Sequence, residues 1–395
     1  MKKNKYQYMR GSYKLIAIVT DFVGGAILSF FRFFIKKRSL PVNPQRIAVF
    51  RMDKLGDVVL SIPAIRGIKK LFPAAEMTLL ISGMAEDIFR YERNSYKIIT
   101  YDGILNCYMT GSKREIPILH DIKNALLLLR ELREKKFDLA VILRGDIFTN
   151  MLVFMSRIPS RIGFGNEGGY FFLTDIIPLS QSRYHELERM EDVLRFLGEK
   201  EPECKMGISL SDAENEAVGR LLRENNLDNS LSYSVISPFT GHKWNTWDAD
   251  RFLKLARRLR DEAGLTVIMT GSEGEKKGIE NLIGGEMAMH NFAGKTSLLE
   301  FVALLKRAKL FVGNDSGPVH LAVSSDVPAV QLFGPGDMRR FAHRGGRNAV
   351  LFKETCSLHP CTIKECKVPE KWCMNEITVD GVFDACMAVL NKHLK

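Results

Sequence analysis

The sequence predicts an α/β protein made of two Rossmann-like, doubly wound domains that face each other across a cleft. Three observations support this prediction. The chain has 395 residues, which is more than one hydrophobic core usually holds. Short β-rich runs alternate with helical stretches, a pattern typical of parallel sheets. The alternation comes in two series, separated by a helical stretch from about His185 to Asn229.

Each series supplies four predicted strands. The first has strands Ile47–Phe50, Met77–Ile81, Ile98–Tyr101 and Leu139–Leu143, with helices Val58–Phe72 and Ile118–Lys136. The second has strands Tyr233–Ser237, Leu265–Thr270, Leu310–Val312 and Ala329–Leu332, with helices Asp248–Ala263, Leu298–Arg307 and Val319–Ser324. We therefore expect an N-terminal segment (1–45), a first domain (46–200), a helical connection (201–230) and a second domain (231–395).

Positive charge is concentrated at the start of the chain. The net charge is +11, and ten of the first 46 residues are Lys or Arg, opposed only by Asp21. The rest is close to neutral, which argues against a nucleic-acid-binding face on the folded body. A basic terminal segment indicates contact with something anionic, and the headgroups of a phospholipid membrane are the expected partner.

An apolar stretch, Leu15–Ile35, lies within this basic segment. Its polar residues are spaced to share one stripe of a helix, with phenylalanines elsewhere around it. We expect the helix to lie among lipid headgroups and keep Asp21 and Arg32 wet, because spanning would cost roughly 2.5 kcal/mol or more for each. A membrane span and a helix buried against the body are the alternatives. A cleaved signal is disfavoured because Lys36-Lys37-Arg38 follows the stretch.

The first candidate site directly follows the first predicted strand, with the sequence Arg51-Met52-Asp53-Lys54-Leu55-Gly56-Asp57. In open α/β sheets the ligand crevice lies at the carboxyl ends of the strands, so these residues are expected to line it. Gly56 permits a sharp turn or a close approach of ligand. Asp57 has two interpretations: it faces a ligand, or it only caps the helix that it precedes.

A second candidate site, Gly313–His320, follows a predicted strand and opens a helix with Pro318 near its first position. Backbone amides around Ser316 and Gly317, at the positive end of the helix dipole, predict an anion site. A well-capped helix with nothing bound is the alternative.

A third candidate site, Ser237–Trp247, also follows a strand. Its loop amides, the Thr240 hydroxyl and the Lys243 charge suit a diphosphate. The alternative is an ordinary loop that places Trp247 in the core.

Four of the seven cysteines are crowded near the C-terminus: Cys356, Cys361, Cys366 and Cys373. Their spacing differs from common zinc signatures, which contain paired C-x2-C. A metal ion or cluster, two disulfides and four unmodified thiols all fit the pattern, with a structural metal slightly favoured. The other three, Cys107, Cys204 and Cys386, are scattered and are expected to be small buried residues.

The three candidate sites, in this order, resemble the ADP-heptose–lipopolysaccharide heptosyltransferases of glycosyltransferase family 9. Leu55-Gly56-Asp57 matches that family's Leu-Gly-Asp after a strand, and Asp315–Ala322 matches its Asp-Ser/Thr-Gly-x-x-His-Leu-Ala. Phe333-Gly334-Pro335 also fits at the expected interval. The third site departs from the family's Lys-x-Trp-Pro, since Asn245-Thr246-Trp247-Asp248 stands there and Lys243 is two residues earlier.

The resemblance implies a GT-B fold and an inverting transfer that needs neither metal nor cofactor. In that scheme residues 46–200 hold the acceptor, and Asp57 is the general base that takes the proton of its hydroxyl. Residues 231–395 hold the nucleotide sugar. Asp315 would bond the sugar hydroxyls, and the whole set of expected donor-binding residues is Thr240, Gly241, Lys243, Asp315, Ser316, Gly317 and His320.

The expected partners are a nucleotide diphosphate sugar, a lipid-linked saccharide acceptor and an anionic membrane, with the protein peripheral or monotopic at the cytoplasmic face of the inner membrane. Two other functions also fit: a GT-B transferase for another nucleotide sugar, and a non-catalytic, membrane-docked nucleotide-sugar-binding protein. Retention of Asp57 disfavours the latter. A Rossmann dehydrogenase is disfavoured because Gly-x-Gly-x-x-Gly is missing after Phe50.

Overall fold

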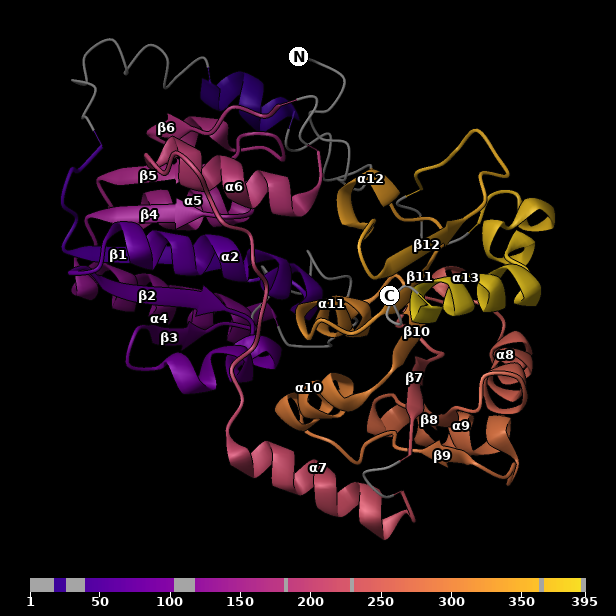
Figure 1. Ribbon diagram of the computed structural model, residues 1–395. Coiled ribbons are helices and arrows are strands. Elements are labelled where there is room, and N and C mark those ends of the chain that lie inside the picture. The colour runs from indigo at the N-terminus through magenta and orange to yellow at the C-terminus, as the bar shows by residue number, and fades with distance from the viewer. Residues whose placement is uncertain are drawn as a thin grey trace. The chain divides into compact units, whose positions relative to one another are not determined.

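The computed structural model describes residues 18–25, 40–102, 118–180, 184–227, 231–361 and 366–391. The chain divides into two compact units, Met1–Lys205 and Met206–Lys395. Among the described residues, each unit is built on its own six-stranded sheet (Figure 1). The predicted α/β class, with two separate series of parallel strands, is confirmed.

The sheet of the first unit has the order β3-β2-β1-β4-β5-β6, and its strands pair in parallel. These strands are β1 (Arg46–Arg51), β2 (Glu76–Ile81), β3 (Lys97–Thr100), β4 (Leu139–Ile142), β5 (Ser160–Gly163) and β6 (Asp175–Ile176). The strand order reverses between β1 and β4. This reversal is the topological switch point, beside which open α/β sheets bind their ligands.

Helices cover both faces of this sheet, which explains why its central strands are continuous apolar runs such as the buried Ile47–Phe50. Helix α2 (Leu55–Leu71) packs against α6 (Glu186–Phe196). Side chains of α4 (Ile118–Lys135) and α5 (Ile147–Met155) share a second cluster with β1 and β4. The rigid layers therefore fix where the loops after β1 and β4 begin.

The second unit repeats this plan with the order β12-β11-β10-β7-β8-β9, again in parallel pairs. Its strands are β7 (Tyr233–Ser237), β8 (Thr266–Met269), β9 (Met289–Asn291), β10 (Leu310–Asn314), β11 (Ala329–Phe333) and β12 (Asn348–Phe352). The switch point falls between β10 and β7. Its helices are α7 (Asp212–Glu224), α8 (Ala249–Asp261), α9 (Lys276–Ile283), α10 (Leu298–Arg307), α11 (Gly317–Ser324), α12 (Met338–Phe341) and α13 (Val379–Asn391).

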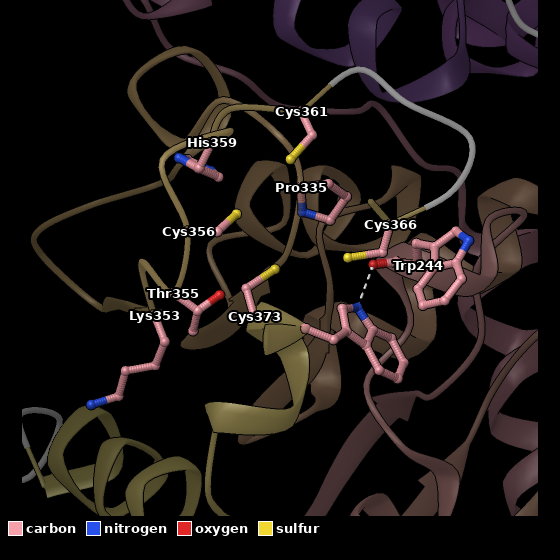
Figure 2. A pocket seen from close by; sticks show the side chains of 10 residues that line it. Trp244, Pro335, Lys353, Thr355, Cys356, His359, Cys361, Cys366 and Cys373 are labelled. Atoms are coloured by element: carbon pink, nitrogen blue, oxygen red, sulfur yellow. Dashed lines mark hydrogen bonds between the residues drawn. The ribbon is translucent and has the colours of Figure 1, made fainter. Parts of the chain in front are cut away.

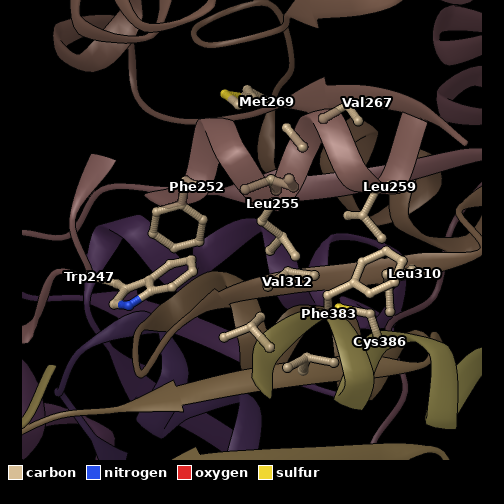
Figure 3. Packing of buried hydrophobic residues seen from close by; sticks show 14 of the residues in the cluster. Trp247, Phe252, Leu255, Leu259, Val267, Met269, Leu310, Val312, Phe383 and Cys386 are labelled. Carbon is tan, nitrogen blue, oxygen red and sulfur yellow. The ribbon is translucent and has the colours of Figure 1, made fainter. Parts of the chain in front are cut away.

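Trp247 anchors the loop that follows β7. Its side chain is fully buried and packs edge-on against Phe252, with ring centroids 4.9 Å apart, in the cluster between the sheet, α8 and α13 (Figure 3). The indole Nε1 donates to the carbonyl of Ile377 at 2.9 Å, as a buried indole requires. The alternative reading of Trp247 as a core residue is therefore correct, and this burial fixes one end of the loop.

Residues 18–25 of the N-terminal segment form a helix against the first unit. The expectation that Asp21 stays wet is wrong: its side chain is buried, and Oδ1 accepts a hydrogen bond from the Gly169 backbone N–H at 2.7 Å. The exposed side chains of this helix are instead apolar, with Phe22 80% exposed. The other residues of the expected Leu15–Ile35 helix lie outside the described ranges. No described helix is long and apolar enough to cross a bilayer.

Candidate active site

Arg51, the last residue of β1, organises the switch point of the first unit. Its guanidinium is 1% exposed and donates to the Leu143 carbonyl at 2.9 Å. It also lies 2.9 Å from Glu186 Oε1, 3.3 Å from Asp53 Oδ2 and 3.4 Å from Asp57 Oδ1. Burial lowers the pKa of Arg51, but the three carboxylates outweigh burial and raise it above its ordinary value. Arg51 therefore stays charged.

Asp57 lies in the first turn of α2, which begins at Leu55 and has Lys54 as its N-cap residue. The interpretation of Asp57 as the cap preceding the helix is therefore wrong. Its side chain is 20% exposed, so it retains access to solvent while Arg51 holds one of its oxygens. Burial raises the pKa of Asp57; Arg51 opposes this, and the Asp53 and Glu186 charges add to it. A partly exposed carboxylate with a raised pKa at a switch point has the properties of a general base.

A second arginine, Arg144, follows β4 and faces the same loop. Its guanidinium lies 3.1 Å from Asp53 Oδ1, 3.6 Å from Glu167 Oε2 and 3.9 Å from Asp146 Oδ2. Asp146 is also the N-cap of α5, where it accepts from the backbone N–H groups of Phe148 and Thr149. Asp53 thus joins the two arginines into one network across the ends of β1 and β4.

The sequence-based prediction missed both Arg144 and Glu186. Arg144 had a signal that could have found it, because it directly follows a predicted strand, as Arg51 does. Glu186 had none: it lies 135 residues beyond Arg51, in the first turn of α6, and only the packing of α6 on α2 brings it there.

In the second unit, Asn314 ties together the two loops at the switch point. It is the last residue of β10 and is fully buried. Its Nδ2 donates to the Pro238 carbonyl, and its Oδ1 accepts from the Trp247 backbone N–H, each at 2.9 Å. Asn245 Nδ2 donates to the Asp315 carbonyl at 2.7 Å. The second and third candidate sites are therefore neighbours in the fold.

Thr240, Gly241 and Lys243 all lie in the loop after β7, but in different situations. The Thr240 hydroxyl is 2.9 Å from that of Thr246 and accepts from the His242 backbone N–H at 3.1 Å. Gly241 and Lys243 are exposed. The Lys243 ammonium lies 5.4 Å from the centre of the Trp244 ring, so the cation sits on the open side of the loop.

Ser316 and Gly317 open α11, as predicted. Ser316 is the N-cap residue, but its hydroxyl makes no capping bond and instead donates to the Asn314 carbonyl at 3.2 Å. Pro318 occupies one of the first two helical positions and has no N–H to offer. The Val319 N–H donates to the Ser316 carbonyl at 3.2 Å, so the Gly317 amide is the first-turn donor left at the positive end of the helix dipole, where an anion is stabilised.

Asp315 and His320 belong to one hydrogen-bonded chain behind α11. Gln331 Nε2 donates to Asp315 Oδ1 at 3.0 Å, and Gln331 Oε1 accepts from the His343 backbone N–H at 3.1 Å. His320 Nδ1 lies 2.7 Å from His343 Nε2, and both rings are buried. His320 is therefore placed to support the loop from behind, while Asp315 is only partly buried.

The loop after β11 approaches the same edge. A side chain at Gly336 would place its Cβ 2.7 Å from Asp315 Oδ2, and one at Gly334 would meet Met374 Sδ at 2.8 Å. A larger residue at either position would therefore displace the Asp315 carboxylate or the Met374 side chain. Phe333-Gly334-Pro335 therefore belongs with the other two loops, so the carboxyl ends of β7, β10 and β11 form one candidate donor-binding edge.

Two doubly wound parallel sheets, each with polar loops gathered at its switch point, match a glycosyltransferase fold of the GT-B type. The chain belongs to glycosyltransferase family 9 (heptosyltransferase), whose family model matches residues 125–371. It is therefore a glycosyltransferase, as the resemblance implied.

Curated relatives agree with this assignment. The chain is 26% identical over 293 residues to lipopolysaccharide heptosyltransferase 3 of Escherichia coli K12, a match that covers 71% of this chain and 80% of the relative. It is 24% identical over 347 residues to lipooligosaccharide heptosyltransferase 2 of Campylobacter jejuni, covering 86% of this chain and 97% of the relative.

Solved structures share the fold. A family 9 glycosyltransferase from Veillonella parvula superposes with a TM-score of 0.73 at 21% identity, covering 89% of this chain and 98% of that one. E. coli ADP-heptose LPS heptosyltransferase II has a TM-score of 0.68 at 19% identity, and the match covers 89% of this chain and 100% of that one. E. coli heptosyltransferase WaaC with ADP-2-deoxy-2-fluoro heptose has a TM-score of 0.61 at 17% identity, and the match covers 86% of this chain and 98% of that one.

Proposed function

We propose that the protein transfers heptose from ADP-heptose to a lipopolysaccharide core or a related lipid-linked glycan, with inversion and without a catalytic metal. The observation that carries the mechanism is the position of Asp57: partly exposed, held by Arg51 and raised in pKa at the switch point. The names of the relatives support heptose and a lipopolysaccharide acceptor. The analogue bound by WaaC supports ADP-heptose as donor.

In the proposed reaction Asp57 accepts the proton of an acceptor hydroxyl as its oxygen attacks the anomeric carbon. The bond from that carbon to the diphosphate oxygen breaks, and ADP leaves with the electron pair. Attack from the side opposite to the leaving group inverts the anomeric configuration. Arg51 holds Asp57 through Oδ1, which leaves the second carboxylate oxygen for the acceptor.

The donor-binding edge of the second unit provides the groups that a departing diphosphate needs. Amides at the start of α11 and the exposed Lys243 ammonium stabilise the developing negative charge. The Thr240–Thr246 pair gives the loop its shape. Asp315, with Gln331 on one carboxylate oxygen, bonds the sugar hydroxyls. In this scheme amides and lysine do the work of a metal ion, and no cofactor is required.

We place the protein at the cytoplasmic face of the inner membrane as a peripheral or monotopic protein. The helix at residues 18–25 exposes Ile18, Val19, Phe22 and Val23. Gly24 of this helix packs closely against the Phe171 ring. The Phe171 ring contacts that of Phe172, which in turn contacts the half-exposed Phe154 of α5. Exposed apolar side chains beside a strongly basic sequence fit the boundary between headgroups and acyl chains.

A transferase for another nucleotide sugar is the second candidate. The observation that favours it is the departure at Asn245-Thr246-Trp247-Asp248, where the family usually has Lys-x-Trp-Pro. Asn245 lies at the donor-binding edge and its buried Oδ1 has no hydrogen-bond partner among the described residues. A donor whose base or sugar differs from that of ADP-heptose would be able to donate a hydrogen bond to Asn245 Oδ1.

The test is the melting temperature of the purified protein with ADP-heptose, UDP-glucose and GDP-mannose, each at the same concentration. A ligand that binds only the native state raises this temperature. We expect ADP-heptose to give the largest rise. A rise with UDP-glucose or GDP-mannose and none with ADP-heptose would replace the proposed donor.

A further inference from the structure

Four cysteines on the segment between β12 and α13 surround a common space. The segment runs from the end of β12 to the start of α13, and Cys356, Cys361, Cys366 and Cys373 all line a single cavity of about 30 Å³. In Figure 2 their sulfur atoms point toward one another across it. All four are described residues, each is half-buried, and each carries a free thiol.

The size of the cavity limits what it can hold. About 30 Å³ has room for a metal ion or a few water molecules. His359 also borders the cavity, but its Nε2 is engaged with the Gly336 carbonyl at 2.9 Å. The four thiols are the largest set of potential metal ligands that line the space, and a thiolate set favours zinc or iron over magnesium or calcium.

The cysteine segment is fastened to the donor-binding edge. The Cys361 backbone N–H donates to the Pro335 carbonyl at 2.8 Å, and Trp372 Nε1 donates to the Trp244 carbonyl at 3.1 Å. Pro335 follows β11, and Trp244 adjoins Lys243 in the loop after β7. An ion held by this segment would therefore stiffen two of the three loops at that edge.

We propose that Cys356, Cys361, Cys366 and Cys373 together bind one zinc or iron ion, which fastens the segment to the donor-binding loops. A tetrahedral zinc ion lies about 2.3 Å from each sulfur, which puts the sulfurs roughly 3.8 Å apart. Among the described residues no three such side chains already stand at metal-holding spacing, so binding draws the thiols into the cavity. Each ligating thiol releases its proton to solvent.

The first test needs neither sugar donor nor acceptor, so it is independent of the proposed function. Full-length protein without an affinity tag is purified under reducing conditions and its zinc and iron are measured. Apo-protein is then titrated with Co²⁺ and followed by visible absorption. We expect one zinc or iron ion per chain, and Co²⁺ bands of a tetrahedral thiolate site. Metal analysis tells zinc from iron.

A matched pair of variants locates the ion. Cys361→Ser should weaken metal binding by more than roughly tenfold, the effect of losing a residue that only hydrogen-bonds to a metal ligand. Cys204→Ser is the control, because Cys204 is also half-buried but belongs to the first unit and does not line the cavity. Removing the metal from the wild type should speed hydrogen exchange of amides 239–246 and 334–337, and leave amides 46–51 unchanged.

Three results would overturn the proposal. The first is reduced wild-type protein that binds none of zinc, iron or Co²⁺. The second is equal metal content in Cys361→Ser and Cys204→Ser. The third is mass spectrometry showing the four cysteines paired in two disulfides as purified under non-reducing conditions. If Cys361→Ser fails to fold, the Co²⁺ spectrum of the wild type still decides. A metal-loaded protein without transferase activity would retain this inference and reject the proposed function.

Discussion

Nη2 of Arg51 lies 3.4 Å from Oδ1 of Asp57 and 2.9 Å from Oε1 of Glu186. One buried guanidinium thus links the proposed base to a carboxylate on a different helix, while Arg189 lies 3.1 Å from the other oxygen of Glu186. The geometry makes Glu186 a positioning residue, because it acts on Asp57 through Arg51. The reactivity of Asp57 should therefore depend on a residue outside its own loop.

This dependence predicts a shift in the pH profile. The pKa of Asp57 is raised above 3.8 by burial, against the opposing effect of Arg51, and the charge of Glu186 contributes to the rise. A general base must be ionised, so kcat/KM should increase with pH through this raised pKa. Glu186→Gln removes a negative charge and leaves Arg51 freer to pair with Asp57, so the ascending limb should move to lower pH. A limb that stays in place or moves up would reject this coupling.

Replacing Arg51 should destabilise the first unit. Arg51→Met removes the cation shared by Asp53, Asp57 and Glu186. Breaking a buried ion pair on one side typically costs about 3–5 kcal/mol, since the other charge stays buried. Arg90→Met is the control, because the Arg90–Asp87 pair is exposed and should change the free energy of unfolding by less than about 1 kcal/mol. Denaturant unfolding measures both, and equal losses would contradict the account.

Asp315 should discriminate between the complete donor and its nucleotide. Asp315→Ala removes the carboxylate assigned to the sugar hydroxyls but keeps the amides at the start of α11. We expect calorimetry to show ADP-heptose losing about 1.5–3 kcal/mol of binding, the usual value of a hydrogen bond to a charged group, with ADP nearly unaffected. Asp380→Ala, at an exposed carboxylate of the same unit, should bind both normally. An equal loss of binding free energy for ADP and ADP-heptose would contradict a contact of Asp315 with the sugar and indicate one near the nucleotide.

Deleting residues 1–40 should separate membrane docking from donor binding. The truncated protein loses the bond from Gly169 to Asp21 but keeps both sheets, so it should still bind ADP. Full-length protein should float with anionic vesicles, and salt should weaken this binding without abolishing it, because insertion of apolar side chains is not screened. Phe22→Ser should weaken flotation more at high salt than at low salt, because at high salt the apolar side chains provide most of the binding. Equal flotation of the full-length and truncated proteins would exclude the segment as the anchor.

The sequence predicts the layers of this fold well because buried parallel strands must be continuous apolar runs. The strand Tyr233–Ser237 and the helix Leu298–Arg307 coincide with the structure at both ends. Asp57 shows where local rules fail: aspartate is a good N-cap, yet α2 begins two residues earlier, and the carboxylate contacts the Arg51 guanidinium instead. Asp21 fails for the same reason, since a buried partner, the Gly169 N–H, lies far along the chain.

The candidate donor residues were found because loops after parallel strands converge on one edge, a rule that needs only the strand positions. The sequence does not predict which residues hydrogen-bond to these candidate residues from within the fold. Gln331 holds Asp315, and His343 meets His320, but neither Gln331 nor His343 carries a motif. Their roles follow from the register of β11 beside β10 and from the path of the chain after α12.

The most direct test of the central claim is a transfer assay with purified protein, ADP-heptose and lipopolysaccharide cores truncated at successive heptose positions. We expect release of ADP together with a core heavier by one heptose, and Asp57→Asn should lower turnover by about two to four decades while binding ADP-heptose as the wild type does. If no truncated core gains a heptose, or if Asp57→Asn turns over at the wild-type rate with saturating acceptor, the account of this site is wrong.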